Sequence, residues 1–173
     1  AYIQFAKLPT PALAPVQWAR LINQLQDQYE FELEGDLPRR VWLADPLQLS
    51  QLLLNLLKNA HESGSDPEHI QLSFTELPDQ LLIRIQDAGG GMSSEALAHA
   101  MVPFYTSKEN GSGIGLTLCR DIAEAHGGSL SLQNQGAGRR RPPSGKSGAF
   151  GGDALRWQSA ACPTKTGRCG PDG

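Results

Sequence analysis

The most regular hydrophobic pattern of the chain lies between residues 45 and 67. Apolar side chains recur there at intervals of three and four, at Leu49, Leu52, Leu53, Leu56, Leu57 and Ala60. This spacing predicts a helix with a broad buried face. Asp45 is a suitable N-cap, Pro46 suits the first helical position, and Gln48 stands where a capping box has its second residue. Gly64 and Pro67 predict the end of this helix.

Shorter patterns predict the other elements. Helical spacing of Trp18, Leu21, Ile22 and Leu25 predicts a helix at residues 16–28. Two further helices are expected at residues 94–101 and 116–126. Alternation of apolar and polar residues predicts strands at 31–34, 41–43, 70–74, 81–85 and 129–133. The turn signal Pro78-Asp79 joins two of these strands into a hairpin. Helices mixed with hairpin strands predict an α+β fold, with helices on one face of a sheet.

Composition narrows the class of protein. The 173 residues suit one domain, and 39% hydrophobic with 19% charged residues excludes collagen-like, coiled-coil and strongly disordered chains. No apolar run approaches the about 18 residues of a membrane span, and no signal peptide is visible. Three scattered cysteines fit neither a disulfide framework nor a zinc site. We therefore expect a cytoplasmic location.

Charge divides the chain near Gly138. Residues 1–138 hold 8 basic and 16 acidic side chains, whereas residues 139–173 hold 7 basic and 2 acidic ones. The second segment is rich in Gly and Pro and shows neither helical nor strand periodicity, so residues 138–173 are expected to be a disordered or irregular tail. We interpret residues 1–14 as a linker arm and 15–137 as the folded domain. Residues 139–141 are three arginines, for which a solvated charge run is favoured over a contact with nucleic acid or an acidic partner.

Two polar motifs interrupt the hydrophobic patterns of the predicted helices and strands. Asn55 and Asn59 lie four residues apart, so they share one helix face, and their amide oxygens suit Mg²⁺. Two surface asparagines are the alternative. Asp87 is followed by three glycines, which allow close approach to a flat ligand, and its carboxylate can accept a hydrogen bond from an exocyclic amine such as that of adenine. The alternative is a simple glycine-rich turn.

Two further motifs follow. The run GSGIGL at residues 111–116 opens a helix, where backbone N–H groups and the helix dipole favour phosphate. It is neither a dinucleotide fingerprint, since no βαβ unit surrounds it, nor a Walker loop. A Walker-like ending, Gly145-Lys146-Ser147, has Arg140 where that loop needs glycine. The run PFYTSK at residues 103–108 suggests a mobile lid with phosphate contacts, although Phe104 equally suits the core.

In this order and spacing, the motifs resemble the ATP-binding catalytic domain of bacterial sensor histidine kinases. This superfamily also contains DNA gyrase and the repair protein MutL. Residues 55–60 (NLLKNA) resemble the N box, 87–92 (DAGGGM) the G1 box, 103–108 the F box and 111–116 the G2 box. The resemblance covers about residues 15–135 and is most similar in style to nitrogen-regulation kinases of the NtrB and NtrY type.

The resemblance implies a two-layer α/β sandwich of the Bergerat type, with a mixed sheet packed on about three helices. ATP and Mg²⁺ are the implied cofactors. Asn59 would bind the metal, Asn55 would lie near the phosphates and metal, and Asp87 would bind the adenine amine. Asn55 and Lys58 are the implied catalytic residues. The other implied nucleotide-binding residues are Gly89, Gly91 and Met92 around the base, Phe104, Thr106, Ser107 and Lys108 in the lid, and Gly111, Ser112, Gly113, Ile114, Gly115 and Leu116 at the phosphates.

The resemblance also implies the reaction. ATP-hydrolysing relatives place Glu where this chain has Asn55, and an amide is no general base, which favours transfer of the γ-phosphoryl to a protein histidine. No acceptor segment is recognised; His61-Glu62 has no matching Pro. The expected partners are a separate dimerisation and phosphoacceptor domain, in a homodimer, and a response regulator. We expect no nucleic acid and no membrane contact by this segment, although the parent protein can be membrane-anchored.

Two other functions stay open. One is a serine kinase of the anti-sigma type on the same fold, and the other is a nucleotide-binding module without catalysis. The family continues after Gly136 into a last strand, whereas residues 139–143 read RRRPP here. A frameshift, a foreign terminal sequence or a natural tail would explain this change. If the last strand is missing, the sheet has an open edge.

Overall fold

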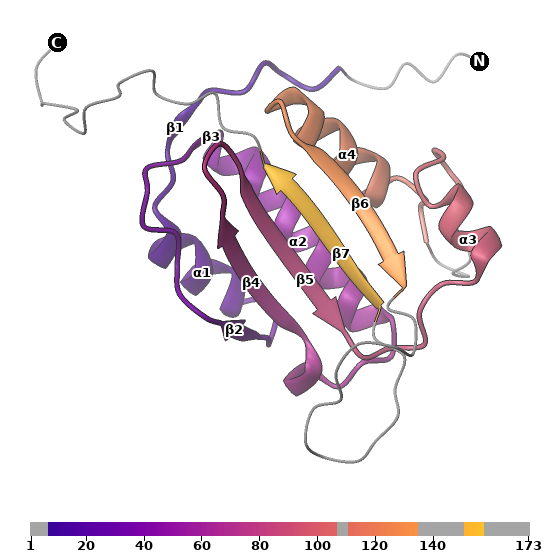
Figure 1. Ribbon diagram of the computed structural model, residues 1–173. Helices are drawn as coiled ribbons and strands as arrows, with labels where there is room; N and C mark the ends of the chain where they lie inside the picture. The colour runs from indigo at the N-terminus through magenta and orange to yellow at the C-terminus, as the bar shows by residue number, and fades with distance from the viewer. Residues whose placement is uncertain (1–6, 107–110, 135–150, 158–173) are drawn as a thin grey trace, which may run out of the picture.

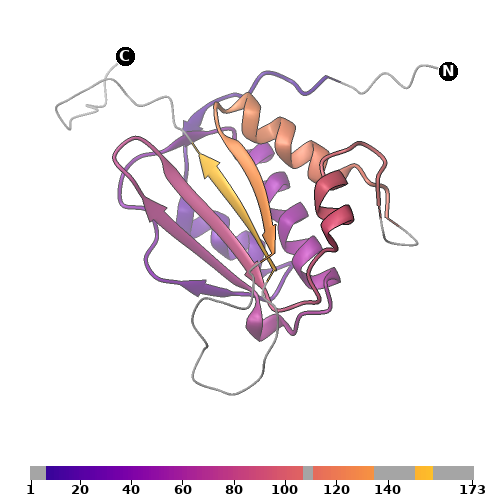
Figure 2. The same cartoon turned by 45° about the vertical axis from the view of Figure 1, so that its right-hand side comes forward.

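The computed structural model describes residues 7–106 and 111–134 in full, and residues 151–157 by their backbone. Within these ranges, helices α1 (Trp18–Gln26), α2 (Pro46–Glu62) and α4 (Gly115–Ala125) cover one face of a five-stranded sheet (Figure 1). The short helix α3 (Ser94–His99) lies near the start of α4 (Figure 1 and Figure 2). The predicted two-layer α/β arrangement is confirmed.

The sheet is mixed, as expected. Its strand order is β2-β4-β5-β7-β6, with β2 (Glu32–Glu34) parallel to β4 (Gln71–Glu76) and the other pairs antiparallel. β4 and β5 (Leu81–Asp87) form the predicted hairpin, which Leu77 N closes by donating to Gln80 O at 2.8 Å. β6 (Ser129–Asn134) follows α4.

A further strand follows β6, within the segment for which a disordered or irregular tail is expected. Residues Gly151–Trp157 form β7, which lies between β5 and β6 and pairs with both. Its first residue, Gly151, pairs with Asp87 on one side and Asn134 on the other. Two glycines weaken the strand signal of this segment, but ladders on both sides satisfy its backbone groups. The rest of the predicted tail, including residues 139–141, lies outside the described residues.

Helix α2 forms the centre of the core. Its leucines at positions 49, 52, 53, 56 and 57 are at most 1% exposed. Asp45 is its N-cap, because Oδ1 accepts from Leu47 N at 3.0 Å and Gln48 N at 3.2 Å. The expected capping box does not form: Gln48 Nε2 donates to Pro9 O at 2.9 Å instead. The N–H of Asp45 is already used, since it donates to Nε2 of His126 at 3.0 Å.

The described part of the N-terminal arm packs on the domain. Strand β1 (Ala14–Pro15) pairs antiparallel with β3 (Leu43–Ala44), and Ala12 N donates to Asp45 Oδ2 at 2.9 Å. β3 begins two residues later than the strand predicted at 41–43, and Val41 is 72% exposed. The arm is therefore attached to the start of α2.

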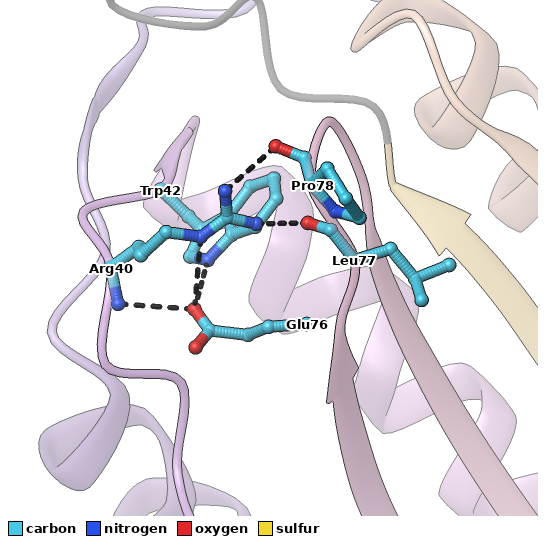
Figure 3. Close-up of polar contacts among 5 residues, drawn as sticks. All are labelled: Arg40, Trp42, Glu76, Leu77 and Pro78. Atoms are coloured by element: carbon cyan, nitrogen blue, oxygen red, sulfur yellow. Dashed lines mark hydrogen bonds and ion pairs between the residues drawn. The ribbon is translucent and has the colours of Figure 1, made fainter. Parts of the chain in front are cut away.

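The loop before β3 is attached to the β4–β5 hairpin (Figure 3). Glu76 Oε1 accepts from Arg40 N at 3.0 Å and from Trp42 Nε1 at 2.9 Å. The Arg40 guanidinium donates to Pro78 O at 2.8 Å and to Leu77 O, and lies 4.8 Å from the Trp42 ring centroid. Burial raises the pKa of Glu76, but the hydrogen bonds from Trp42 and Arg40 outweigh it and hold this pKa below its ordinary value.

Candidate functional site

A cavity of about 860 Å³ lies among the C-terminal half of α2, the loop after β5, helix α3, the start of α4 and the end of β6. Its volume is in the range of small-molecule and cofactor sites. Many of the predicted site residues line it: Asn55, Lys58, Asn59, Asp87, Gly91, Met92, Thr106, Gly111, Ser112, Gly113, Gly115 and Leu116. Segments from residues 55 to 134 of the chain thus meet at one place.

The polar stripe of α2 faces this cavity. Asn55 and Asn59 are half-buried and both line it, so they are not simply surface asparagines. Lys58 is exposed and lies 3.9 Å from Glu62, an ion pair of the surface type. The stripe presents amide oxygens, which are hard ligands, to any group bound in the cavity.

Asp87 ends β5 at the cavity. Its Oδ1 accepts a hydrogen bond from Ser63 Oγ at 2.8 Å and another from Gly89 N at 2.9 Å. Among the described residues no donor is found for Oδ2. The carboxylate is therefore held through one oxygen, and its second oxygen can accept a hydrogen bond from a ligand.

The glycines after Asp87 have different roles. Gly89 does not line the cavity; a Cβ there would lie 2.1 Å from Ser63 Oγ, so Gly89 lets the loop contact the end of α2. Gly91 has a φ of +68° and does line the cavity. Asn134 holds the next residue, since its Oδ1 accepts from Met92 N at 3.0 Å and its Nδ2 donates to Met92 O. The loop is fixed at both ends.

The described part of the lid is attached to the glycine-rich run. Phe104 N donates to Gly113 O at 3.0 Å, and a Cβ on Gly113 would lie 2.5 Å from Phe104 C. Phe104 is 51% exposed and does not line the cavity, so a core position is wrong for it. Tyr105 is the aromatic residue that lines the cavity instead. Ile114 is also absent from the lining, and Ser107 and Lys108 lie outside the described residues.

The cavity also has lining residues that were not among the predicted site residues. They are Ala60, Glu62, Ser63, Ala96, Leu97, Ala100, Tyr105, Leu132, Gln133 and Asn134. Ser63 lies four residues after Asn59, and this spacing was the one signal in the sequence that could have found it. The N-terminus of α4 also opens on the cavity through Gly115, where the N–H groups of the first helical turn and the helix dipole favour an anion.

Comparison with known proteins identifies the class. Residues 44–149 match the family described as "Histidine kinase-, DNA gyrase B-, and HSP90-like ATPase". The match covers more than half of the chain, and the chain belongs to this family of ATPases. It includes α2, the loop after β5 and the start of α4, which together form the cavity.

The similar curated proteins are sensor kinases. Sensor protein FixL of Bradyrhizobium diazoefficiens is 33% identical over 99 residues, which are 56% of this chain and 20% of FixL. An NtrY-like sensor histidine kinase of Rickettsia felis is 27% identical over 143 residues, 78% of this chain and 24% of that protein. The chain thus spans about a quarter or less of the length of these relatives.

A solved structure shares the fold. The full-length kinase ShkA, determined in complex with AMPPNP, gives a TM-score of 0.66 at 22% identity, over 92% of this chain and 34% of ShkA. The expected resemblance to sensor histidine kinases, including the NtrY type, is confirmed. In the described part of the chain, no helix combines the length and hydropathy that crossing a membrane requires.

Proposed function

We propose that this domain binds Mg-ATP in the cavity and donates the γ-phosphoryl to a histidine on a separate dimerisation domain. The observation that carries the proposal is the convergence of Asn59, Asp87 and the N-terminus of α4 on one cavity. These three features offer a metal ligand, an acceptor for an amine and a site for phosphate.

The base would bind beside Asp87. A carboxylate with one oxygen available accepts a hydrogen bond from the 6-amino group of adenine, whereas it repels the 6-oxo group of guanine. Met92, Leu97 and Ala100 add apolar side chains to the cavity wall. Such a wall with a few oriented polar groups is typical of cofactor sites.

The phosphates would bind between α2 and the start of α4. Mg²⁺ fits the donor set there, because Asn59 and Asn55 offer amide oxygens on one half-buried face and Mg²⁺ keeps several water ligands of its own. When bound, the ion neutralises charge on the phosphate oxygens. The N–H groups at Gly113 and Gly115 and the exposed ammonium of Lys58 are the chain's own contributions to phosphate binding.

Transfer rather than hydrolysis suits this cavity. Asn55 cannot take a proton from water. Each of the four histidines contacts a residue that does not line the cavity. His61 Nε2 contacts Glu30 O, and His99 Nδ1 contacts Glu95 O. His69 lies near Asp66. His126 is bonded to Asp45 at the far end of α2. None of the described histidines lines the cavity, which supports an acceptor on another domain.

The parent protein would be a homodimer in which this domain lies in the cytoplasm. A response regulator would then receive the phosphoryl group. The size of the relatives supports further domains, since the matched part is about a quarter or less of each. These partners extend the proposal and are tested separately from nucleotide binding.

Calorimetric titration of the 173-residue chain with ATP, with and without Mg²⁺, tests the binding step. We expect binding that is tighter with Mg²⁺. Incubation with labelled ATP and a dimerisation hairpin from a related kinase then tests transfer, with acid-labile label on the hairpin as the expected result. A folded chain that binds no ATP would overturn the proposal, and binding without transfer would favour a module without catalysis.

A further inference from the structure

Ser63 lies where the end of α2 meets the loop after β5, at the wall of the cavity. It is the C-cap of α2 and continues the stripe of Asn55 and Asn59 at the same spacing of four residues. All three residues line the cavity. Ser63 also touches the loop that follows β5, which carries Asp87.

The hydroxyl of Ser63 has two acceptors within reach. Its Oγ lies 2.8 Å from Asp87 Oδ1 and 2.6 Å from the carbonyl oxygen of Ala60. A hydroxyl carries one hydrogen, so it fully satisfies only one of them. The hydrogen bond to an ionised carboxylate is the stronger, and the alternative would turn a lone pair of Oγ toward that carboxylate. Ser63 Oγ therefore donates its hydrogen to Asp87 Oδ1.

The loop after β5 is built around this contact. Gly90 N donates to Ser63 O at 3.3 Å, and a Cβ on Gly89 would lie 2.6 Å from Ser63 O. Because glycine has no side chain, residue 89 can lie directly against Ser63, as any other residue could not. Since Gly89 N also donates to Asp87 Oδ1, this oxygen accepts two hydrogen bonds.

We propose that Ser63 is a positioning residue for adenine recognition, which holds Asp87 Oδ1 so that Oδ2 is presented to the 6-amino group. The proposal rests on the proposed function. Oδ2, which no described residue engages, is the acceptor left for a ligand in the cavity. Ser63 also connects this carboxylate to α2, so the base-binding group and the metal-binding Asn59 share one rigid support.

The test compares ATP with purine riboside 5′-triphosphate, which lacks the 6-amino group. Removing a hydrogen bond to a charged group costs roughly a factor of ten in affinity. We expect Ser63→Ala to raise the Kd for Mg-ATP about tenfold. The Kd for the analogue should stay within about twofold, because the oriented oxygen has no amine to bind. A role in folding alone would weaken both ligands alike.

Ser65→Ala is the matched control. Ser65 is 8% exposed, and its Oγ accepts from Ala88 N at 3.0 Å in the same loop without touching the carboxylate. We expect this variant to leave the ratio of the two Kd values unchanged. If Ser65→Ala changes the ratio as much as Ser63→Ala does, the effect belongs to the loop and the proposal is overturned.

Asp87→Asn provides a second measurement. In that background Ser63→Ala should cause no further loss of ATP affinity, because the carboxylate that Ser63 orients is gone. Additive losses would overturn the role of Ser63. If the unaltered chain binds no ATP, the proposed function and this inference both fall. If it binds ATP but Ser63→Ala affects ATP and the analogue equally, or neither, only this inference falls.

Discussion

The backbone N–H of Asp45 donates a hydrogen bond of 3.0 Å to Nε2 of His126, which joins the start of α2 to the end of α4. Nδ1 of the same ring lies 2.7 Å from Ile122 O and therefore carries the hydrogen. The imidazole ring thus bridges two helices whose opposite ends line the cavity. Because the joint lies at the far end, it fixes the spacing of the helices without occupying the site.

This joint predicts a stability effect without a binding effect. His126→Ala leaves the Asp45 N–H without its partner, at a cost of about 1–3 kcal/mol, whereas the Ile122 carbonyl keeps its hydrogen bond from the backbone N–H of residue 126. Urea denaturation measures the loss, and ATP titration of the folded variant should give an unchanged Kd. His99→Ala, on an exposed histidine of α3, is the control and should unfold like the unaltered chain.

The carboxylate of Asp45 makes the start of α2 sensitive to acid. The hydrogen bond from Ala12 N, and then those from Gln48 N and Leu47 N, outweigh the effect of burial and hold the pKa of Asp45 below its ordinary value of 3.8. Because the folded pKa is the lower one, the stabilisation is complete above pH 3.8 and is lost as pH falls through the folded pKa. Asp45→Ala should cost about 1 kcal/mol at pH 7. Denaturation curves of both chains should converge in acid, and a difference independent of pH would contradict this assignment.

Asp87→Asn should weaken ATP binding by about a hundredfold and leave the fold intact. The change removes the charge that accepts the adenine amine, and it places an amide donor where an acceptor is needed. Calorimetry measures the loss, and circular dichroism checks the fold. A Kd within twofold of the unaltered chain would argue against base recognition by Asp87.

Asn59→Ala should weaken ATP binding about tenfold or more when Mg²⁺ is present, and much less in EDTA, because the amide oxygen acts through the ion. Gln51→Ala is the control, since Gln51 lies two turns earlier on the same stripe and is exposed outside the cavity. Equal losses with and without the metal would show that Asn59 has another role.

Gly113→Ala should impair nucleotide binding. Its φ of +65° strains any other residue, and the added Cβ would lie 2.5 Å from Phe104 C, so the turn that opens α4 must shift. Gly35→Ala tests the backbone strain without the steric clash, because Gly35 has a φ of +79° with nothing within 4 Å of an added Cβ. We expect Gly35→Ala to cost about 1–2 kcal/mol of stability with an unchanged Kd. An intact Kd for Gly113→Ala would contradict a role for this turn.

Much of the site follows from sequence because its residues lie in short motifs. Asn55 and Asn59 share a face through helical periodicity alone, and Asp87 follows a predicted strand. Tyr105 and Asn134 could not be selected in this way. Tyr105 lines the cavity while its neighbour Phe104 is exposed, and that choice depends on the contact of Phe104 with Gly113.

The sequence by itself determined the helices, the β4–β5 hairpin and the order of the motifs, because periodicity and capping act over a few residues. Only the tertiary structure decided the placement of β7 between β5 and β6, since both ladders join segments far apart in the chain. It likewise directed Gln48 to Pro9 and Asp45 N to His126, across 39 and 81 residues. The contact of Ser63 with Asp87 arises in the same way, because packing of α2 against the sheet brings together groups that no local pattern relates.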